Sequence, residues 1–241
     1  MTLFAEATDL VPVTPNGRTI FATPIQFQIP QQQTTLLLGP NGSGKTTLME
    51  TFCGSMKISS GTLTFEGSPL STMKPKDLSA LFSYVAQSLS FPEHLSILEL
   101  IRLTRRLSCL VANAPTDLSD TPVDFFLKVF DVQHLKSRTL SRLSSGERQR
   151  AFLAAAFCKP SKAVLLDEPT NHLDPLASKA LTASIHQAIE KEKRTVIIAT
   201  HDKQLAHATG NWFLGFREGK IKFCGGFSQE KAESIFDQIF V

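Results

Sequence analysis

A glycine-rich turn between an apolar run and a helical pattern constrains this chain more than any other feature. Residues 39–46 read Gly-Pro-Asn-Gly-Ser-Gly-Lys-Thr and fit the pattern G-x-x-x-x-G-K-[ST] of a phosphate-binding loop. The run Thr34–Leu38 predicts a buried strand before the turn, and Thr46–Phe52 predicts a helix after it. A chance glycine-rich turn would not have this context. We therefore expect a site for a nucleoside triphosphate, formed by Gly39, Pro40, Asn41, Gly42, Ser43, Gly44, Lys45, Thr46 and Thr47.

The residue types of this loop suit the chemistry of phosphate. Glycines allow successive backbone N–H groups to converge on phosphate oxygens, and a helix N-terminus adds a partial positive charge at the same place. Lys45 supplies a point charge for the outer phosphates. The hydroxyl group of Thr46 can join the ligand shell of Mg²⁺, so we expect this ion as the cofactor.

A second candidate cluster follows another apolar run. Val164–Leu166 predicts a buried strand, and the carboxylates Asp167 and Glu168 come directly after it. In a parallel sheet such a strand delivers its last side chains to the edge where a phosphate-binding loop also lies. Asp167 is then placed to hold Mg²⁺, and Glu168 to polarise the attacking water. Alone, such a pair is often only a cap at the end of a strand.

Length and composition allow an ordinary folded protein and argue against several classes. The chain has 241 residues, 42% of them hydrophobic and 20% charged, which is typical of a globular domain. A net charge of +3 is too small to predict direct contact with nucleic acid. Its four cysteines are widely spaced, so we expect free thiols in a reducing compartment, at Cys53, Cys109, Cys158 and Cys224. No apolar run is long enough for a membrane span, and the N-terminus does not resemble a signal peptide.

The pattern along the chain predicts an α/β fold with a mainly parallel core, a strand-rich flank and an inserted helical lobe. The first 38 residues are strand-rich, and Gly61–Gly67 predicts a short strand with one exposed face. Residues from about 93 to 158 are helical in pattern, with Pro115 and Pro122 in a loop. A helix over Pro175–Lys191 separates the two buried strands 163–166 and 195–199, as a crossover between parallel strands requires. Trp212–Phe216 and Lys220–Cys224 flank Glu218-Gly219, which indicates a hairpin.

Between the phosphate-binding loop and the Asp-Glu strand, the order of further motifs carries a resemblance. Leu143–Glu147 reads Leu-Ser-Ser-Gly-Glu, with a serine at a predicted helix N-cap before Arg148–Phe157. Together these segments resemble the nucleotide-binding domain of ATP-binding-cassette (ABC) proteins, from about residue 16 to about residue 226. The matching positions are Gly39–Thr46 (Walker A), Gln87 (Q-loop), Leu143–Glu147 (signature), Val164–Glu168 (Walker B), Asp174 (D-loop) and His201 (switch histidine).

The resemblance implies a fold and a division of the chain. It implies a P-loop NTPase with a RecA-like parallel core, an antiparallel β-subdomain and an inserted ABC-type helical subdomain. The core and β-subdomain would comprise residues 1–87 and 159–241. The helical subdomain, with the signature, would comprise residues 88–158, and the whole would be one ABC ATPase domain.

The resemblance also implies roles for residues. Two cassettes would pack head to tail around two ATP molecules, and Ser144, Ser145, Gly146 and Glu147 would face the ATP held by the other subunit. Glu168, His201 and Gln87 would be catalytic: Gln87 would sense Mg²⁺ and the attacking water, and His201 would contact the γ-phosphate and orient Glu168. Thr46, Gln87 and Asp167 would form the metal site, and Asp174 would belong to the D-loop.

Some positions depart from the family pattern. Ser145 stands where glycine is usual and Glu147 where glutamine is commonest, yet we expect hydrolysis to survive. The family often stacks an aromatic ring on the adenine from the loop near Asn16–Arg18, and this chain has none there. Phe21 is the nearest aromatic, and Arg18 could stack its guanidinium plane instead.

The resemblance implies the ATPase subunit of an ABC membrane transporter. The amino-acid sequences of three segments are most similar to those of importers of ferric siderophores, haem and cobalamin: Phe82–Gln87, Leu143–Phe157 and Asp167–Asp174. Partners would be transmembrane permease subunits and a second copy of this chain or a related subunit, with the protein on the cytoplasmic face of the cell membrane. Three alternatives stay open: an exporter ATPase, a soluble cassette acting on ribosomes or nucleic acid, and a regulatory cassette that binds ATP without hydrolysis. The cargo, the direction of transport and the packing of the predicted C-terminal helix Gln229–Val241 are also open.

Overall fold

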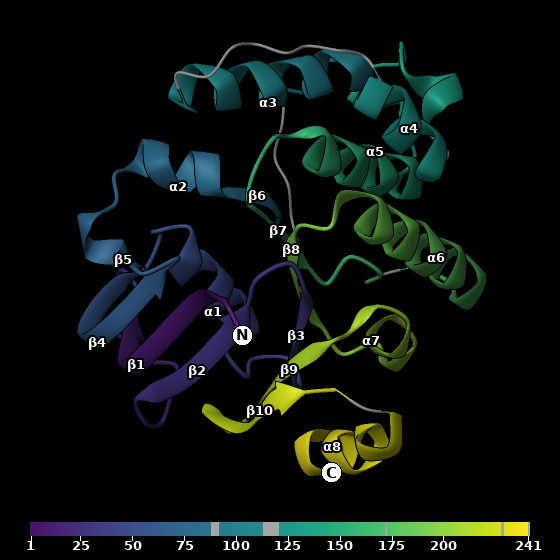
Figure 1. The fold of residues 1–241 in the computed structure, drawn as a ribbon. Coiled ribbons are helices and arrows are strands. Elements are labelled where there is room, and N and C mark those ends of the chain that lie inside the picture. The colour runs from purple at the N-terminus through teal and green to yellow at the C-terminus, as the bar shows by residue number, and fades with distance from the viewer. Residues whose placement is uncertain (88–91, 113–120, 172, 228, 241) are drawn as a thin grey trace.

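The computed structural model describes residues 1–87, 92–112, 121–171, 173–227 and 229–240, and within them the chain forms two sheets (Figure 1). The larger sheet has the strand order β10-β9-β3-β8-β7-β6. Neighbouring strands in it are parallel except β9 and β10, which form the predicted hairpin. Its strands are β3 (Thr34–Leu38), β6 (Phe82–Val85), β7 (Ala163–Asp167), β8 (Thr195–Thr200), β9 (Trp212–Arg217) and β10 (Lys220–Gly226).

The central strands are apolar throughout because both faces of the larger sheet are covered. Leu36 and Leu38 of β3 belong to one buried cluster, with residues of the helices α3 to α8. Leu37, between them, belongs to a second cluster with α1 and the smaller sheet. Successive side chains of a strand point to opposite faces, so every position of β3 is buried. This two-sided burial explains why the strands predicted at 34–38, 163–166 and 195–199 are confirmed.

The smaller sheet is antiparallel and has the order β2-β1-β4-β5. A bulge interrupts the pairing of β1 with β4 between Thr8 and Val11. Gly61 lies opposite this bulge with φ +79°, and a Cβ atom there would come within 2.1 Å of the Asp9 carbonyl oxygen, so the turn of the chain requires glycine. The strand predicted at Gly61–Gly67 therefore begins earlier than its apolar alternation indicated. The strands are β1 (Leu3–Val13), β2 (Ile25–Pro30), β4 (Lys57–Phe65) and β5 (Ser68–Pro69).

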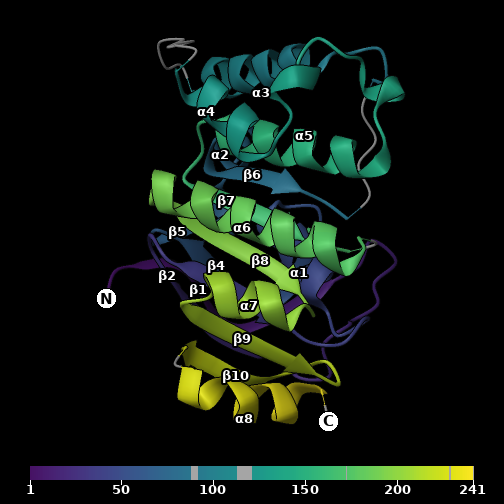
Figure 2. The same ribbon diagram turned by 90° about the vertical axis from the view of Figure 1, so that its right-hand side faces the viewer.

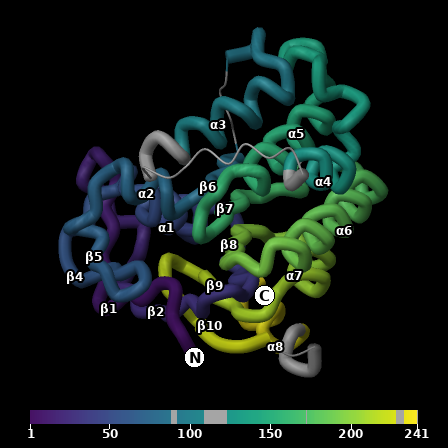
Figure 3. Tube along the Cα trace, turned by 45° about the horizontal axis from the view of Figure 1, so that its top comes forward, coloured from purple at the N-terminus to yellow at the C-terminus, as the bar shows by residue number. Residues whose placement is uncertain are grey.

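Helices cover both faces of the larger sheet. Helix α1 lies between the two sheets, while α6 and α7 cover the opposite face (Figure 2). Helices α3, α4 and α5 pack against one another as a lobe beyond β6 (Figure 3), as the helical pattern predicted. The helices are α1 (Lys45–Phe52), α2 (Pro75–Leu81), α3 (Ile97–Ala112), α4 (Thr121–Val129), α5 (Ser145–Cys158), α6 (Pro175–Glu192), α7 (Lys203–Thr209) and α8 (Gln229–Phe240), with short 3-10 turns at Leu70–Thr72, Gln133–Leu135 and Leu140–Arg142.

One buried guanidinium joins the end of the helical lobe to the parallel sheet. Arg194, just before β8, donates to the carbonyl oxygens of Phe157 at 2.6 Å and Lys159 at 2.8 Å. The last carbonyl groups of a helix have no partner within the helix, so this contact satisfies the C-terminal end of α5. It also fixes that end of α5 relative to β8.

The remaining sequence predictions divide into those the structure resolves and those outside the described residues. The C-terminal helix packs on the core, because Ile235, Phe236 and Ile239 of α8 are buried. Cys53, Cys158 and Cys224 are free thiols, and burial raises the pKa of Cys53 to about 12. The side chain of Cys109 and the loop position Pro115 lie outside the described part of the chain. Among the described residues, no helix is both long and apolar enough to cross a membrane.

Candidate active site

The phosphate-binding loop leaves the N-terminus of α1 open. Gly44 is the N-cap residue, with φ 107°, and no side chain of the described residues caps the helix there. A Cβ atom on Gly44 would come within 2.7 Å of the Phe21 ring, so both the conformation and the close approach require glycine. The first backbone N–H groups of a helix have no partner within it, so this end can bind an anion.

Lys45 is nearly buried and lies between its own loop and a carboxylate. Its side chain is 5% exposed, and its Nζ atom donates to the carbonyl oxygen of Gly39 at 2.7 Å and of Pro40 at 3.2 Å. Nζ also lies 3.2 Å from Oε1 of Glu168. The ammonium group is therefore held at the loop, with Glu168 beside it.

Asp167 ends β7 next to the loop and has one carboxylate oxygen without a partner. Its Oδ2 atom accepts a hydrogen bond from the Thr46 hydroxyl at 2.8 Å. Its Oδ1 atom is buried and has no hydrogen-bond partner within the described residues. Burial raises the pKa of Asp167, and the nearby Glu168 acts in the same direction, while the hydrogen bond from Thr46 opposes both. Such a buried acceptor calls for a ligand, because leaving it unpaired is costly.

Glu168 and His201 come from neighbouring parallel strands and contact each other. In the register of β7 and β8, Asp167 pairs with Ala199, which places the residues that follow each strand side by side. The Nδ1 atom of His201 lies 2.9 Å from Oε2 of Glu168. Glu168 has φ 49°, in the left-handed region that is costly for a residue with a side chain. The strained backbone directs its carboxylate between Lys45 and His201.

A cavity of about 340 Å³ joins half of the predicted residues. It is lined by loop residues together with Ile20, Gln87 and Glu168, so four separate segments of the sequence meet there. None of the signature residues Ser144 to Glu147 is among the described residues that line it. The lining residues are Ile20, Asn41, Gly42, Ser43, Gly44, Lys45, Thr46, Thr47, Gln87 and Glu168.

The signature residues form the N-terminus of α5, three residues earlier than the helix predicted from Arg148. Ser144 is the N-cap, as predicted, and its Oγ atom accepts from the backbone N–H of Glu147 at 3.2 Å. In return, the Glu147 carboxylate accepts from the backbone N–H of Ser144 at 2.7 Å. This hydrogen bond is the main reason that the pKa of Glu147 is lowered. The two residues form a capping box.

Two further aspartates begin helices near this region. Asp174 is the N-cap of α6 and accepts from the backbone N–H groups of Leu176 at 3.0 Å and Ala177 at 2.9 Å. Asp202 is the N-cap of α7, and its Oδ2 atom also accepts from the hydroxyl group of Thr170 at 3.0 Å. The bond between Thr170 and Asp202 connects the segment after β7 to the segment after β8.

Phe21 does not provide the aromatic platform for a base. Its side chain is 4% exposed, and its ring supports the loop at Gly44 and contacts Phe216. Ile20 lines the cavity instead, and the sequence analysis did not identify it. It also missed Tyr84, whose hydroxyl lies 3.4 Å from Oδ2 of Asp167. No local pattern marks either residue, since only the folded chain brings them to the site.

The comparison with protein families agrees with this geometry. The family profile described as "ABC transporter" matches residues 22–171, which include the loop, Gln87, the signature and the Asp-Glu strand end. The chain belongs to the ABC transporter family. ABC ATP-binding proteins are ATPases, and this protein is an ATP-binding and ATP-hydrolysing member of the family.

Relatives and solved structures extend the family match over most of the chain. The petrobactin import ATP-binding protein FatE of Bacillus anthracis is 27% identical over 90% of this chain and 86% of its own. The sulfate/thiosulfate import ATP-binding protein CysA of Salmonella typhi is 32% identical over 86% of this chain but 56% of its own. The structure of cbiO1 from Clostridium perfringens, part of the ABC transporter complex cbiONQ, has a TM-score of 0.78 at 24% identity, covering 99% of this chain and 92% of that one. This last likeness supports the ABC ATPase fold.

Proposed function

We propose that this ABC protein is the ATP-hydrolysing subunit of a membrane importer for an iron–siderophore complex. The observation that carries the ATPase part is the set of contacts that joins the phosphate-binding loop to the two strand ends: Thr46 with Asp167, Lys45 with Glu168, and Glu168 with His201. The names of the relatives FatE, FpuC and YusV, all siderophore import or transport ATP-binding proteins at 26–29% identity, support the cargo class. These names agree with the similarity of Phe82–Gln87, Leu143–Phe157 and Asp167–Asp174 to importers of ferric siderophores, haem and cobalamin.

In this proposal Mg²⁺ enters with ATP. The buried, unpartnered Oδ1 atom of Asp167 and the adjacent Thr46 hydroxyl are oxygen donors of the kind that Mg²⁺ prefers, so the residues fit the ion. Asp167 and Thr46 would hold it, with Gln87 at the cavity wall as the third predicted contact. When bound, the ion neutralises charge on the phosphates.

The chain's own residues then divide the work of hydrolysis. Lys45 and the open N-terminus of α1 bind the phosphates. Glu168 takes up a proton from the attacking water, and its contact with His201 holds the carboxylate in place for that transfer. The Nζ atom of Lys45, 3.2 Å from Oε1 of Glu168, holds this nearly buried carboxylate beside the phosphate-binding loop.

The second half of each ATP site comes from another subunit. Ser144 to Glu147 do not line the cavity of their own chain. They form a helix N-terminus, which can bind an anion such as a phosphate group. We therefore propose a head-to-tail pair, of two copies or of this chain with a related subunit, in which Asp174 lies near the contact. Residues 88–158 would move as one unit on the core 1–87 and 159–241.

The membrane partner is identified by capture. A tagged Glu168→Gln chain is incubated with solubilised membranes of its native cell in ATP and Mg²⁺, and co-purifying proteins are identified. A polytopic permease, on whose cytoplasmic face this chain sits, is the expected result. Ribosomes or nucleic acid would overturn the transporter proposal and leave the ATPase standing. The matched control is Lys45→Met, which should not be held in the ATP-bound state.

The cargo class is tested by uptake. Cells that lack this chain should lose uptake of ⁵⁵Fe presented as a siderophore complex and keep uptake of ³⁵S-sulfate. The opposite pattern would favour the anion class indicated by CysA, which is the most identical of the relatives described above. A normal uptake of both would contradict the import proposal.

A further inference from the structure

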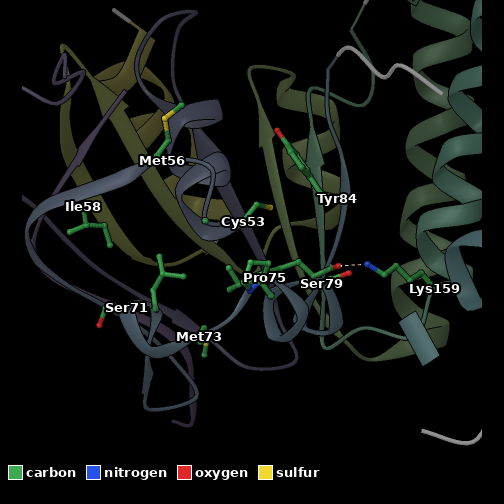
Figure 4. Close-up of a pocket in the computed structure, with 13 residues that line it drawn as sticks. Cys53, Met56, Ile58, Ser71, Met73, Pro75, Ser79, Tyr84 and Lys159 are labelled. Atoms are coloured by element: carbon green, nitrogen blue, oxygen red, sulfur yellow. Dashed lines mark hydrogen bonds between the residues drawn. The ribbon is translucent and has the colours of Figure 1, made fainter. Parts of the chain in front are cut away.

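A second and larger cavity has Tyr84, which contacts Asp167 of the candidate active site, among its lining residues. It has a volume of about 670 Å³ and is bounded by the smaller-sheet side of the molecule, by α2 and by β6 (Figure 4). Most of its wall is apolar, including Met56, Ile58 and Met73. On the β6 side, Tyr84 and Lys159 line it (Figure 4).

Lys159 makes its hydrogen bond to the backbone of β6, whereas Tyr84 contacts Asp167 of the candidate active site. The Nζ atom of Lys159 donates to the Phe82 carbonyl oxygen at 2.7 Å, which satisfies an edge-strand acceptor. The ring of Tyr84 lines the large cavity, and its hydroxyl group lies 3.4 Å from Oδ2 of Asp167. Because β6 pairs with β7, with Tyr84 opposite Leu165, the sheet itself fixes this approach.

The hydroxyl group of Tyr84 is placed to donate a hydrogen bond to the carboxylate of Asp167. Burial is the main reason that the pKa of this hydroxyl group is raised, and the nearby Asp167 raises it further. At 3.4 Å the hydrogen bond between the two side chains is a long one.

The geometry of Asp167 gives this bond a specific consequence. Both described donors, Thr46 and Tyr84, contact Oδ2, and Oδ1 is left without a hydrogen-bond partner among the described residues. Thr46 is itself a proposed ligand of that ion, so its hydroxyl must serve two partners. Tyr84 takes no part in the proposed ligand set and can hold the carboxylate throughout.

We infer that Tyr84 is a positioning residue for the metal site, whose hydroxyl group holds the Asp167 carboxylate in the orientation that binds Mg²⁺. The inference rests on the Mg²⁺ site of the proposed function. It adds a residue outside the recognised motifs and connects the large cavity to the chemistry through one side chain.

The first test replaces Tyr84 with Phe, which keeps the ring in the cavity and removes only the hydroxyl. The Mg²⁺ concentration that gives half-maximal ATPase activity should rise about three- to tenfold, because one long hydrogen bond to Asp167 is lost. The rate at saturating Mg²⁺ should stay near that of the unmodified protein. ATP binding in EDTA should not change, which separates positioning from a general loss of structure. The control is Ser79→Ala, which removes a hydroxyl from the same cavity wall.

The variant Asp167→Asn distinguishes a failure of the inference about Tyr84 from a failure of the proposed Mg²⁺ site. If Asp167→Asn loses the Mg²⁺ dependence and Tyr84→Phe keeps the wild-type dependence, the inference about Tyr84 is overturned and the metal site stands. If Asp167→Asn leaves the Mg²⁺ dependence unchanged, the proposed metal site itself is wrong.

A second readout does not depend on turnover. Tyr84 is the one tyrosine of this chain, so 3-fluorotyrosine incorporation places a single ¹⁹F label there. Its resonance should shift when Mg²⁺ is added to the ATP-loaded Glu168→Gln protein, and the shift should disappear when Asp167→Asn is added. If the ¹⁹F chemical shift does not change although Mg²⁺ binds, the inference is overturned.

Discussion

The N-termini of α1 and α5 are the two proposed phosphate sites of this chain, yet their capping is opposite. At α1 the N-cap is Gly44, no described side chain caps it, and the first turn has no acidic residue. At α5 a Ser144–Glu147 capping box closes the same kind of terminus, with a carboxylate in the first turn. The first site is open and backed by a buried lysine, while the second is closed by its own side chains.

The difference shows that a helix N-terminus can be left uncapped to bind an anion or capped by side chains to stabilise the separate subunit. An uncapped helix N-terminus leaves backbone donors unpaired, which is tolerable where an anion will bind and costly elsewhere. A terminus that meets its phosphate only in a complex must be stable alone, and a capping box contributes about 1 kcal/mol to that. In the proposed head-to-tail pair, the hydrogen bonds of the α5 capping box would be partly exchanged for contacts with phosphate.

The largest expected effect comes from Glu168→Gln, which also tests whether the α1 N-terminus of one subunit meets the α5 N-terminus of another. Glu168→Gln removes the proposed base while keeping the side chain's shape, so the hydrolysis rate should fall by about 10²- to 10⁴-fold. ATP affinity should be retained, and gel filtration with ATP should show a dimer. A monomer under these conditions, with ATP bound, would mean that the α1 and α5 termini do not meet without the membrane partner.

Lys45→Met tests the open terminus by itself. Losing the charge near the phosphates should weaken ATP binding by about 2–3 kcal/mol, or roughly 30- to 150-fold, as measured by titration with a fluorescent ATP analogue. Lys128→Met, on the exposed side of α4, is a matched control and should bind normally. An unchanged affinity would show that backbone donors alone hold the phosphates.

Ser144→Arg tests the closed terminus. The bulky cation should lower steady-state ATPase activity by at least about tenfold, because it fills the place of a phosphate in the partner's site. ATP affinity of the separate subunit should change less than twofold.

Mixing the two variants tests the geometry directly. A heterodimer of Ser144→Arg with Lys45→Met has one site with both Lys45 and Ser144 intact, so part of the activity should return. If the mixture stays as inactive as either variant alone, the head-to-tail arrangement is contradicted.

Glu147→Gln should have the smallest effect, with opposite signs for stability and rate. The amide can still close the box, but the charge beside the incoming phosphate disappears, so the ATPase rate should rise about two- to fivefold. The thermal midpoint should fall by no more than about 2 °C, because the helix dipole loses a favourable charge. A lower rate would show that the carboxylate assists the signature rather than opposing it.

The sequence predicted those parts of the fold whose pattern is local. Buried parallel strands are apolar along their whole length, and Ser144 is a visible N-cap, so both were predictable. Helix α2 and strand β6 were missed because each is short and Phe82–Val85 has little context. The site was only partly visible: motifs located Lys45 and Glu168, but their ion pair depends on how β7 approaches the loop. The proposed roles of Gln87, Asp174 and the signature residues stay predictions.

The Arg194 contact has a mechanical consequence for the helical lobe. It pins the C-terminal end of α5, whereas Ser144, at the other end, has no such tie through Arg194. A helix of 14 residues is about 21 Å long, so turning it by about 10° around the pinned end would carry Ser144 through about 4 Å. A rotation of the lobe about the Arg194 contact would therefore displace the signature residues more than any other part of α5.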